Sequence, residues 1–155
     1  MKTNDVTGRL RAGFVNVAVE LGRPGISASF EDVQKVTRAL ARLDVEFQKE
    51  NPVTSLFTSD RNGDLNPEVL GERVLSALVK FEIPVSRVPE LVEALEEAGK
   101  TVDTVFSAAL AEPIRPGESE PELIQILEEN GIFYRPNGKT NVGLGRPFLP
   151  VEAAS

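Results

Sequence analysis

The sequence predicts a mainly α-helical protein, a small helical bundle of five or six helices followed by an irregular C-terminal arm rich in proline and glycine. Two observations support this prediction. Apolar residues recur every three or four positions over much of the chain. Residue types that begin and end helices flank these stretches: candidate caps are Ser29, Asn66, Ser86 and Ser119, and candidate stops are Pro52, Gly99, Pro113 and Gly131.

Residues 9–21 are compatible with two kinds of secondary structure. Alternate positions are apolar, as in a half-buried strand: Val15, Val17, Val19 and Leu21. A second apolar set repeats at helical spacing: Leu10, Phe14, Val17 and Leu21. Because Asn4 or Asp5 can cap a helix, we favour a helix, although Gly8 and Gly13 weaken it and a strand remains the competing interpretation.

The clearest helix begins after Ser29, whose hydroxyl is placed to cap it with Asp32 at the third position. Its apolar face consists of Phe30, Val33, Val36, Leu40, Leu43 and Phe47. This heptad-like spacing requires a helical partner, so it indicates packing in the chain's own core, with a subunit interface as the alternative. Asn51 and Pro52 end the element.

Residues 51–66 form a polar connection that begins like a calcium loop, with Asp60, Asn62 and Asp64 at alternate positions. An EF-hand loop also needs glycine at its sixth position, an apolar residue at its eighth and a bidentate glutamate at its twelfth. The chain has Leu65, Pro67 and Gly71 there. We therefore predict an exposed turn over residues 60–64, not a metal site.

A helical hairpin is predicted for residues 66–98, at the centre of a helical domain that spans residues 1–134. Asn66-Pro67-Glu68 is a typical helix opening, and an apolar stripe follows until Ile83-Pro84. Ser86 then caps a second helix, which Gly99 ends. Two helices joined by so short a connection pack antiparallel and bury their stripes together.

The hairpin sequence resembles a known family. VLSALV at residues 74–79, followed by IPVSRVPELV at residues 83–92, is similar to the N-terminal region of MucR and Ros transcriptional regulators. Those proteins have an apolar helix, a Val-Pro connection and a Leu-Pro-x-Leu-Ile opening to the next helix. The resemblance covers about thirty of the 155 residues and implies an oligomerisation module. DNA binding does not follow, because that family binds DNA through a zinc finger and this chain has no cysteine or histidine.

The last third contains two further helical patterns. Thr101 is placed to cap a segment that ends before Pro113, with an apolar stripe of Val102, Val105, Phe106, Ala109 and Leu110. A second helix has Pro121 at its first position and ends at Gly131. Residues 132–134 fit a short strand or an extended segment. Residues 135–155 contain too many prolines and glycines for regular structure, which predicts an extended arm.

Composition excludes several classes of function. Without cysteine or histidine, the chain has no thiolate nucleophile, no imidazole base and no zinc site made of sulfur and nitrogen ligands. Because the net charge is −7, we expect no direct binding to nucleic acid or to anionic lipid. The sequence has no apolar run of the roughly eighteen residues that a membrane span needs, and no signal-peptide core. We expect a cytoplasmic protein, or one within a particle assembled in the cytoplasm.

Three short motifs suggest chemistry but lack the surroundings that the chemistry needs. Gly138-Lys139-Thr140 has no glycine five positions earlier, where a phosphate-binding loop requires one, and residues 143–146 lack the third glycine of a dinucleotide fingerprint. Glu93, Glu96 and Glu97 match the polar face of an amphipathic helix. We therefore assign no catalytic, cofactor-binding or metal-binding residues and expect no cofactor.

Two functional hypotheses remain. The first is a non-catalytic self-assembling or protein-interaction protein, either a virion or scaffold subunit or the oligomerisation module of a regulator, most simply a homo-oligomer. The second is a small enzyme or ligand-binding protein that works through carboxylates, arginines and Tyr134.

Charge distribution favours the first hypothesis, because residues 1–29 and 135–155 each carry +2 whereas residues 30–134 carry −11. The predicted interface combines the hairpin with the arm: Leu70, Val74, Leu78, Leu91, Val92, Leu95, Phe148 and Leu149. The predicted electrostatic contacts to an acidic neighbouring copy, or to another protein subunit, are Arg135, Lys139 and Arg146.

Overall fold

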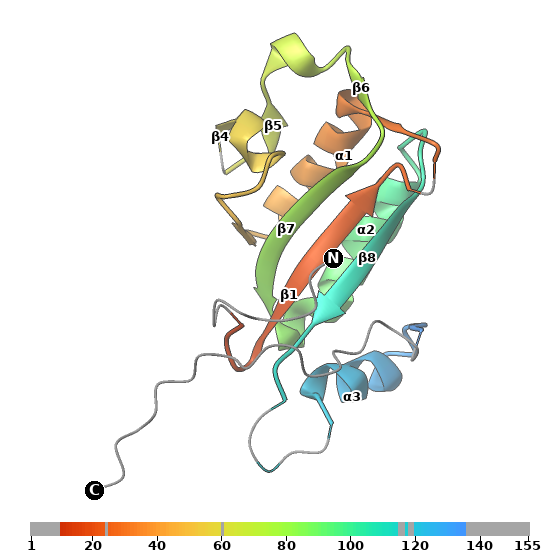
Figure 1. The fold of residues 1–155 in the computed structure, drawn as a ribbon. Helices are drawn as coiled ribbons and strands as arrows, with labels where there is room; N and C mark the ends of the chain where they lie inside the picture. Colours follow the sequence, from red (N-terminus) through yellow and green to blue (C-terminus); the bar gives the residue numbers. More distant parts are fainter. Residues whose placement is uncertain (1–9, 24, 60, 115–116, 118–119, 136–155) are drawn as a thin grey trace, which may run out of the picture.

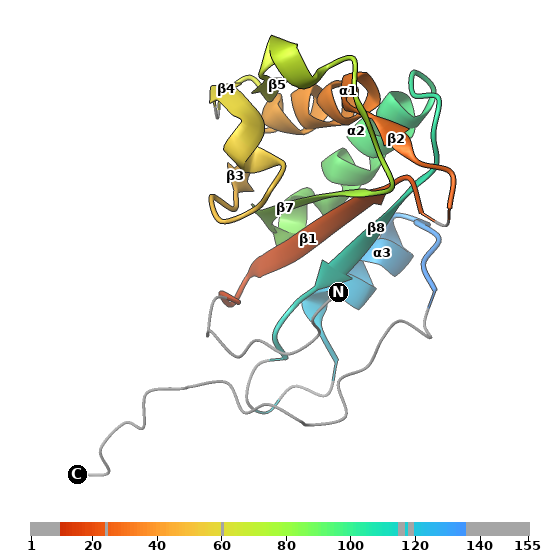
Figure 2. The same ribbon diagram turned by 45° about the horizontal axis from the view of Figure 1, so that its top comes forward.

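The protein is built on a four-stranded antiparallel sheet with helices on one face (Figure 1). This computed structural model describes residues 10–23, 25–59, 61–114, 117 and 120–135. The sheet has the order β3-β7-β1-β8, with bounds Glu46–Phe47, Ala77–Pro84, Phe14–Leu21 and Phe106–Ala111. The helices are α1 (Phe30–Ala41), α2 (Val88–Gly99) and α3 (Glu122–Glu129). Figure 2 shows α1 and α2 on the same side of the sheet.

The chain order explains this arrangement. The main elements follow one another as two β-α-β units, β1-α1-β3 and β7-α2-β8. In the sheet, β7 lies between β1 and β3, and β1 lies between β7 and β8. This is the connectivity of the ferredoxin-like fold. The fold brings the N-terminal strand β1 to the middle of the sheet and leaves β3 and β8 at its edges.

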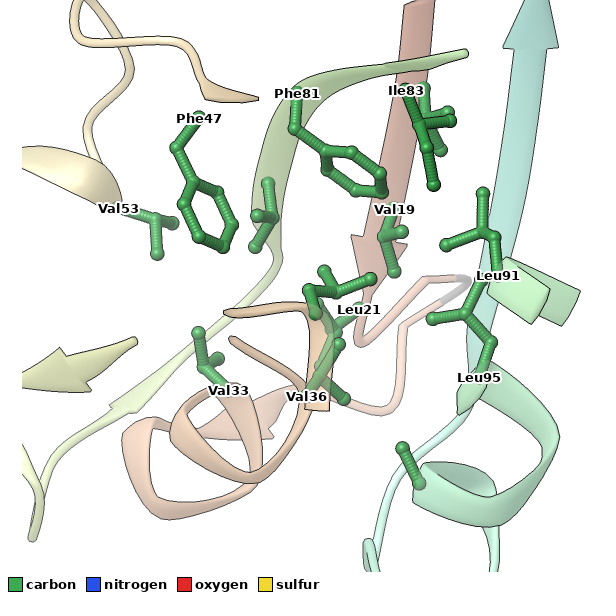
Figure 3. Packing of buried hydrophobic residues seen from close by; sticks show 14 of the residues in the cluster. Val19, Leu21, Val33, Val36, Phe47, Val53, Phe81, Ile83, Leu91 and Leu95 are labelled. Atoms are coloured by element: carbon green, nitrogen blue, oxygen red, sulfur yellow. The ribbon is translucent and has the colours of Figure 1, made fainter. Parts of the chain in front are cut away.

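The core lies between the sheet and the helices (Figure 3). Alternate residues of β1 and β7 face α1 and α2, and they are buried: Val15, Val17, Val19, Leu21, Ala77, Val79, Phe81 and Ile83. The helices contribute Val33, Val36, Leu40, Leu91 and Leu95. The Phe47 ring of β3 packs edge-on against Phe57 and Phe81 and thereby extends the core to the β3 edge of the sheet.

Short elements complete the fold. Strand β2 (Ala28–Ser29) pairs with β6 (Arg73–Val74), and β4 (Phe57–Ser59) pairs with β5 (Asp64–Leu65). Three short 3-10 turns are η1 (Thr54–Leu56), η2 (Pro67–Val69) and η3 (Val85–Arg87). Helix α3 packs against α2 and η3 through Leu123 and Leu127, both buried.

The mainly α-helical prediction is wrong, because antiparallel sheets dominate the structure. Residues 14–21 form β1 instead of the favoured helix. The strand period prevails because β1 has sheet partners on both sides, and its four alternate apolar residues are fully buried only in a strand. Gly13, at φ 78°, makes the turn before it.

The predicted hairpin over residues 66–98 is also wrong in its first half. Asn66 does cap, accepting a hydrogen bond from the Glu68 amide, but only the short turn η2 follows. The strand β7 then occupies residues 77–84. The helical pattern of Leu70, Val74, Leu75, Leu78 and Val79 overlaps the true alternation, which continues through Phe81 and Ile83. The second helix is present as α2, with Arg87 rather than Ser86 at its cap.

The prediction for residues 101–110 fails in the same way, because β8 stands where a helix was expected. Thr101 turns its hydroxyl back to donate to the Ala98 carbonyl, so it follows α2 and does not begin a helix. The helix predicted after Ser29 is correct at its start, but it ends at Ala41 and not near Asn51, and Phe47 lies in β3. Helix α3 has Pro121 at its cap and not at its first position as predicted, and Gly131 turns the chain after it at φ 63°. The candidate cap Ser119 lies outside the described residues. Residues 132–134 form no strand.

The predicted turn is present between β4 and β5, with Arg61 and Asn62 exposed, and it is also fixed against α1 (residues 34–38) through the buried Gly63. Asp60 lies outside the described residues. The buried Thr37 hydroxyl donates to the Gly63 carbonyl at 2.6 Å, and the Leu65 amide donates to the Gln34 side chain. Arg38 forms an ion pair with Asp64. Gly63 has φ 71°, and its missing side chain lets the turn reach the backbone of α1 at Thr37.

We therefore expect Gly63→Ala to lower the free energy of unfolding by about 2 to 4 kcal/mol, because it adds a clash with α1 to the cost of left-handed backbone. Gly25→Ala is the matched control, since Gly25 has φ 69° and open space around it. The control should cost only about 1 kcal/mol. Urea unfolding followed by circular dichroism measures both, and equal losses would contradict the docked turn.

Candidate functional site: an open sheet edge

Strand β8 forms one edge of the sheet, and within the described part of the chain no other strand pairs with its outer side. The Gly22 amide donates to the Val105 carbonyl, so these opposed residues form a hydrogen-bonded pair at the start of the β1–β8 ladder. Hydrogen-bonded and non-hydrogen-bonded pairs alternate along an antiparallel ladder. Residues 107, 109 and 111 therefore point their amides and carbonyls toward β1. Those of Phe106, Ala108 and Leu110 point away from the sheet.

The β8 edge carries none of the usual protection against pairing. Its six residues are uncharged, contain no proline and follow a regular register with β1. Ser107 and Ala108 are exposed, and among the described residues β8 pairs with β1 alone. Charged side chains, prolines, bulges or very short strands ordinarily blunt such an edge.

The opposite edge of the same sheet is blunted. Strand β3 is two residues long, and Glu46 on it is exposed. Glu46 lies directly opposite Glu82 of β7, an arrangement that repels. Arg11 relieves the repulsion because its guanidinium forms ion pairs with both carboxylates. The hydrogen bond from Arg11 to Glu82 is the main reason that the pKa of Arg11 is raised.

Exposed apolar side chains flank both ends of β8. At its start, Val105 is exposed, and so is Ile26 in the turn after Gly22. Leu75, in the connection between β6 and β7, is 86% exposed, and its carbonyl lies close to Gly22. Beyond its end, Ile114 is exposed. Of the exposed large apolar side chains, Val105 and Ile114 thus flank β8 along the chain, whereas Leu75 precedes β7 and Phe133 follows α3.

A buried carboxylate positions the loop that leads into β8. Asp32 is 4% exposed at the start of α1, where its carboxylate accepts hydrogen bonds from the Ser29 hydroxyl and from Lys35 Nζ. Lys35 also donates to the Thr101 carbonyl. Burial raises the pKa of Asp32, but the hydrogen bonds from Lys35, Ser29 and the Asp103 amide outweigh it, so the pKa lies below its usual value.

The loop is fixed from its other side too. The Thr104 hydroxyl donates to the Ser27 carbonyl at 2.7 Å, and the Phe106 ring lies over Gly99 of α2. Ser27 itself has φ 71°. The start of β8 is thus held by α1, by α2 and by the turn before β2, which makes the edge a rigid feature.

A second feature is a shallow hollow of about 400 Å³ near the C-terminal end of α1. Its lining residues are Arg38, Ala41, Arg42, Arg61, Asn62 and Asp64. The ion pair with Asp64 neutralises Arg38, so Arg42 and Arg61 leave the hollow positive. Tyr134 belongs elsewhere, after α3, where its hydroxyl donates to Glu128; this bond raises the Tyr134 pKa.

The predicted interface residues that the structure describes do not form one surface. Leu91 and Leu95 are buried in the chain's own core, and Val92 is half-buried beside them. Leu70 and Val74 are half-buried around η2 and β6, and Leu78 lies on the sheet face opposite the helices. Arg135 is exposed after α3. Lys139, Arg146, Phe148 and Leu149 lie outside the described residues, so the docking of the arm stays a prediction.

Sequence reasoning missed β8 as a site because it assigned residues 102–110 to a helix. The available signal was the run of β-branched and aromatic residues at Thr104, Val105 and Phe106, followed by an uncharged stretch up to Glu112. The alanines of that stretch suit a helix equally well, so the signal alone is ambiguous.

Comparison with families of known proteins, with curated proteins and with solved structures finds no match. The likeness to MucR and Ros regulators therefore stays a prediction, and strand β7 stands where that likeness implies a helix. In the part of the chain that the structure describes, no helix is long and apolar enough to cross a membrane. The same residues contain no group of three side chains suited to hold a metal ion.

We expect Asp32→Asn to reduce the free energy of unfolding at pH 7 by about 1 to 2 kcal/mol, because it weakens charged hydrogen bonds at the helix start. The folded pKa of Asp32 lies below its unfolded value of about 3.9. The carboxylate therefore contributes its full stability above about pH 4, and this contribution is lost as pH falls through the folded pKa.

Urea unfolding of wild type and Asp32→Asn between pH 7 and pH 3 tests this expectation. The difference in stability should shrink toward the acidic end. Glu93→Gln on the exposed face of α2 is the control and should change stability little at any pH. A difference that stays constant across the range would contradict a role for the ionised carboxylate.

Proposed function

We propose that the chain is a non-catalytic, self-assembling protein whose sheet edge at β8 is its interaction surface. The observation that carries this proposal is the contrast between the two edges of one sheet, since β3 is short and charged whereas β8 is longer and uncharged. Open backbone groups along an apolar edge pair readily with another strand. A protein that works as a free monomer gains nothing from leaving one edge open while blunting the other.

Rigidity of the edge supports the same proposal. Binding costs less free energy when the surface is ordered before the partner arrives. Two hydrogen bonds, from Lys35 to Thr101 and from Thr104 to Ser27, hold the segment before β8 in place without a partner subunit. A scaffold or virion subunit and the oligomerisation module of a regulator are both consistent with such an edge. We place the protein in the cytoplasm or in a particle assembled there, and we propose no direct contact with nucleic acid.

Light scattering after size exclusion should give a molar mass well above the 16.8 kDa of one chain, and the mass should fall on dilution. Because the edge is uncharged, raising the salt concentration from about 0.05 to 1 M should not dissociate the assembly. A mass of 16.8 kDa at all concentrations would reject self-assembly.

The arginine-lined hollow supports ligand binding as a second candidate function. Guanidinium groups bind phosphate and carboxylate oxygens in pairs, and Arg42 and Arg61 line the hollow together. Asn62 adds an amide beside them, although its side chain already bonds to Asp64. A compact anion with several oxygens is the ligand class that fits these groups.

Inorganic phosphate tests the ligand-binding function. At constant ionic strength, about 10 mM phosphate should raise the melting temperature of the wild type relative to chloride, if a millimolar site exists there. The double variant Arg42→Gln/Arg61→Gln should lose the increase, whereas Arg23→Gln, which lies outside the hollow, should retain it. No increase in the wild type would reject this candidate.

A further inference from the structure

We infer that the occupant of the β8 edge is β8 of a second copy of this chain, paired antiparallel about a two-fold axis at Ala108. This inference rests on the proposed function and names the partner and the geometry of assembly. The two sheets would join edge to edge, with the helices of both copies on the same side.

The outward groups of β8 fix the register. Only Phe106, Ala108 and Leu110 offer amides and carbonyls to a partner, so they must lie opposite each other for the bonds to form. With the axis at Ala108, Phe106 of one copy faces Leu110 of the partner subunit, and Ala108 faces its own counterpart. Every outward backbone group of the strand then has a partner. A shift of two residues along the strand leaves some of them unpaired.

The side chains are compatible with self-pairing. Since β8 carries no charge, no like charges meet across the axis. The small Ala108 at the centre allows close approach, and an aromatic ring meets a leucine on each side of it, a favourable cross-strand pair.

The flanking residues add complementary apolar surface. In this register, Val105, which directly precedes β8 in one copy, lies opposite Ala111 of the partner subunit. Val105 and Ile114 are both exposed in the single chain. Pairing would therefore cover an exposed apolar side chain, Val105, at each end of the paired strands.

The other edge explains why assembly would stop at two copies. A two-fold contact uses the same surface on both subunits and therefore closes. The outer edges of the joined sheet would both be β3, which is two residues long and bears Glu46 with its Arg11 ion pair. The wild type should consequently have twice the mass of one chain rather than form an open series.

A proline at residue 108 tests the pairing. Ala108→Pro removes an amide that points away from the sheet, so the ladder with β1 stays intact while the partner loses a donor and meets the ring. The molar mass should halve, from twice 16.8 kDa to 16.8 kDa. Ala108→Ser, which keeps the amide and the small size, should retain the wild-type mass. Circular dichroism should show that both variants keep the wild-type spectrum.

A cysteine at the same position tests the register independently of folding effects. The chain has no cysteine, so a single introduced thiol reports only on its own surroundings. Opposed residues of a hydrogen-bonded antiparallel pair have Cα atoms about 5.5 Å apart, within the range of a disulfide. Mild oxidation of Ala108→Cys should give a covalent dimer that reductant reverses, whereas Glu93→Cys, exposed on α2, should stay monomeric on a denaturing gel.

The outcomes separate this inference from the proposed function. If the wild type is assembled, but Ala108→Pro keeps its mass and Ala108→Cys does not cross-link, the chain assembles through another surface and the β8 pairing is overturned. Loss of assembly in Ala108→Pro without cross-linking of Ala108→Cys overturns the two-fold register. A monomeric wild type overturns both proposals, and the partner of β8 would then be a strand of a different protein. Halved mass together with specific cross-linking supports the inference.

Discussion

The fold depends on burying one face of β1. Val15, Val17 and Val19 are completely inaccessible to solvent, and β1 is hydrogen-bonded on both sides. A shift of one residue would turn this whole apolar face to the other side of the sheet, so the register of β7 and β8 against β1 is fixed. That register also decides which backbone groups of β8 face outward. The surface proposed for assembly is therefore a consequence of how the centre of the sheet is packed.

Features set by a few neighbouring residues could be predicted from the sequence. The Ser29 cap depends on the amide of Asp32 and the turn at Gly131 on the backbone of that residue. The strands were missed because their apolar residues satisfy two periods at once. In residues 74–79, either a helix or a strand buries an apolar face. The segment forms a strand because it can pair with β1, which lies about sixty residues earlier in the chain.

The candidate site could not be predicted for a related reason. Whether a strand is an edge depends on the order of strands in the sheet, and no residue of β8 encodes that order. The hollow is equally non-local, because Arg42 and Arg61 meet only when the β4–β5 turn lies on α1. The sequence predicts a turn over residues 60–64, but the close approach of Gly63 to Thr37 depends on the position of α1. The sequence therefore predicts individual turns and caps, but not which residues from distant parts of the chain come together in a site.

The central position of β1 has a consequence for biosynthesis. Asn16 pairs with Glu82 on one side and with Ala111 on the other, so both partners of the first strand are translated long after it. Throughout that interval the nascent chain carries an apolar strand with two bare edges. The ribosome must have released residue 111 from its exit tunnel before the sheet can close, and non-local pairings of this kind form slowly. The order of the strands thus leaves the apolar face of β1 without its sheet partners until residues 106–111 have been synthesised.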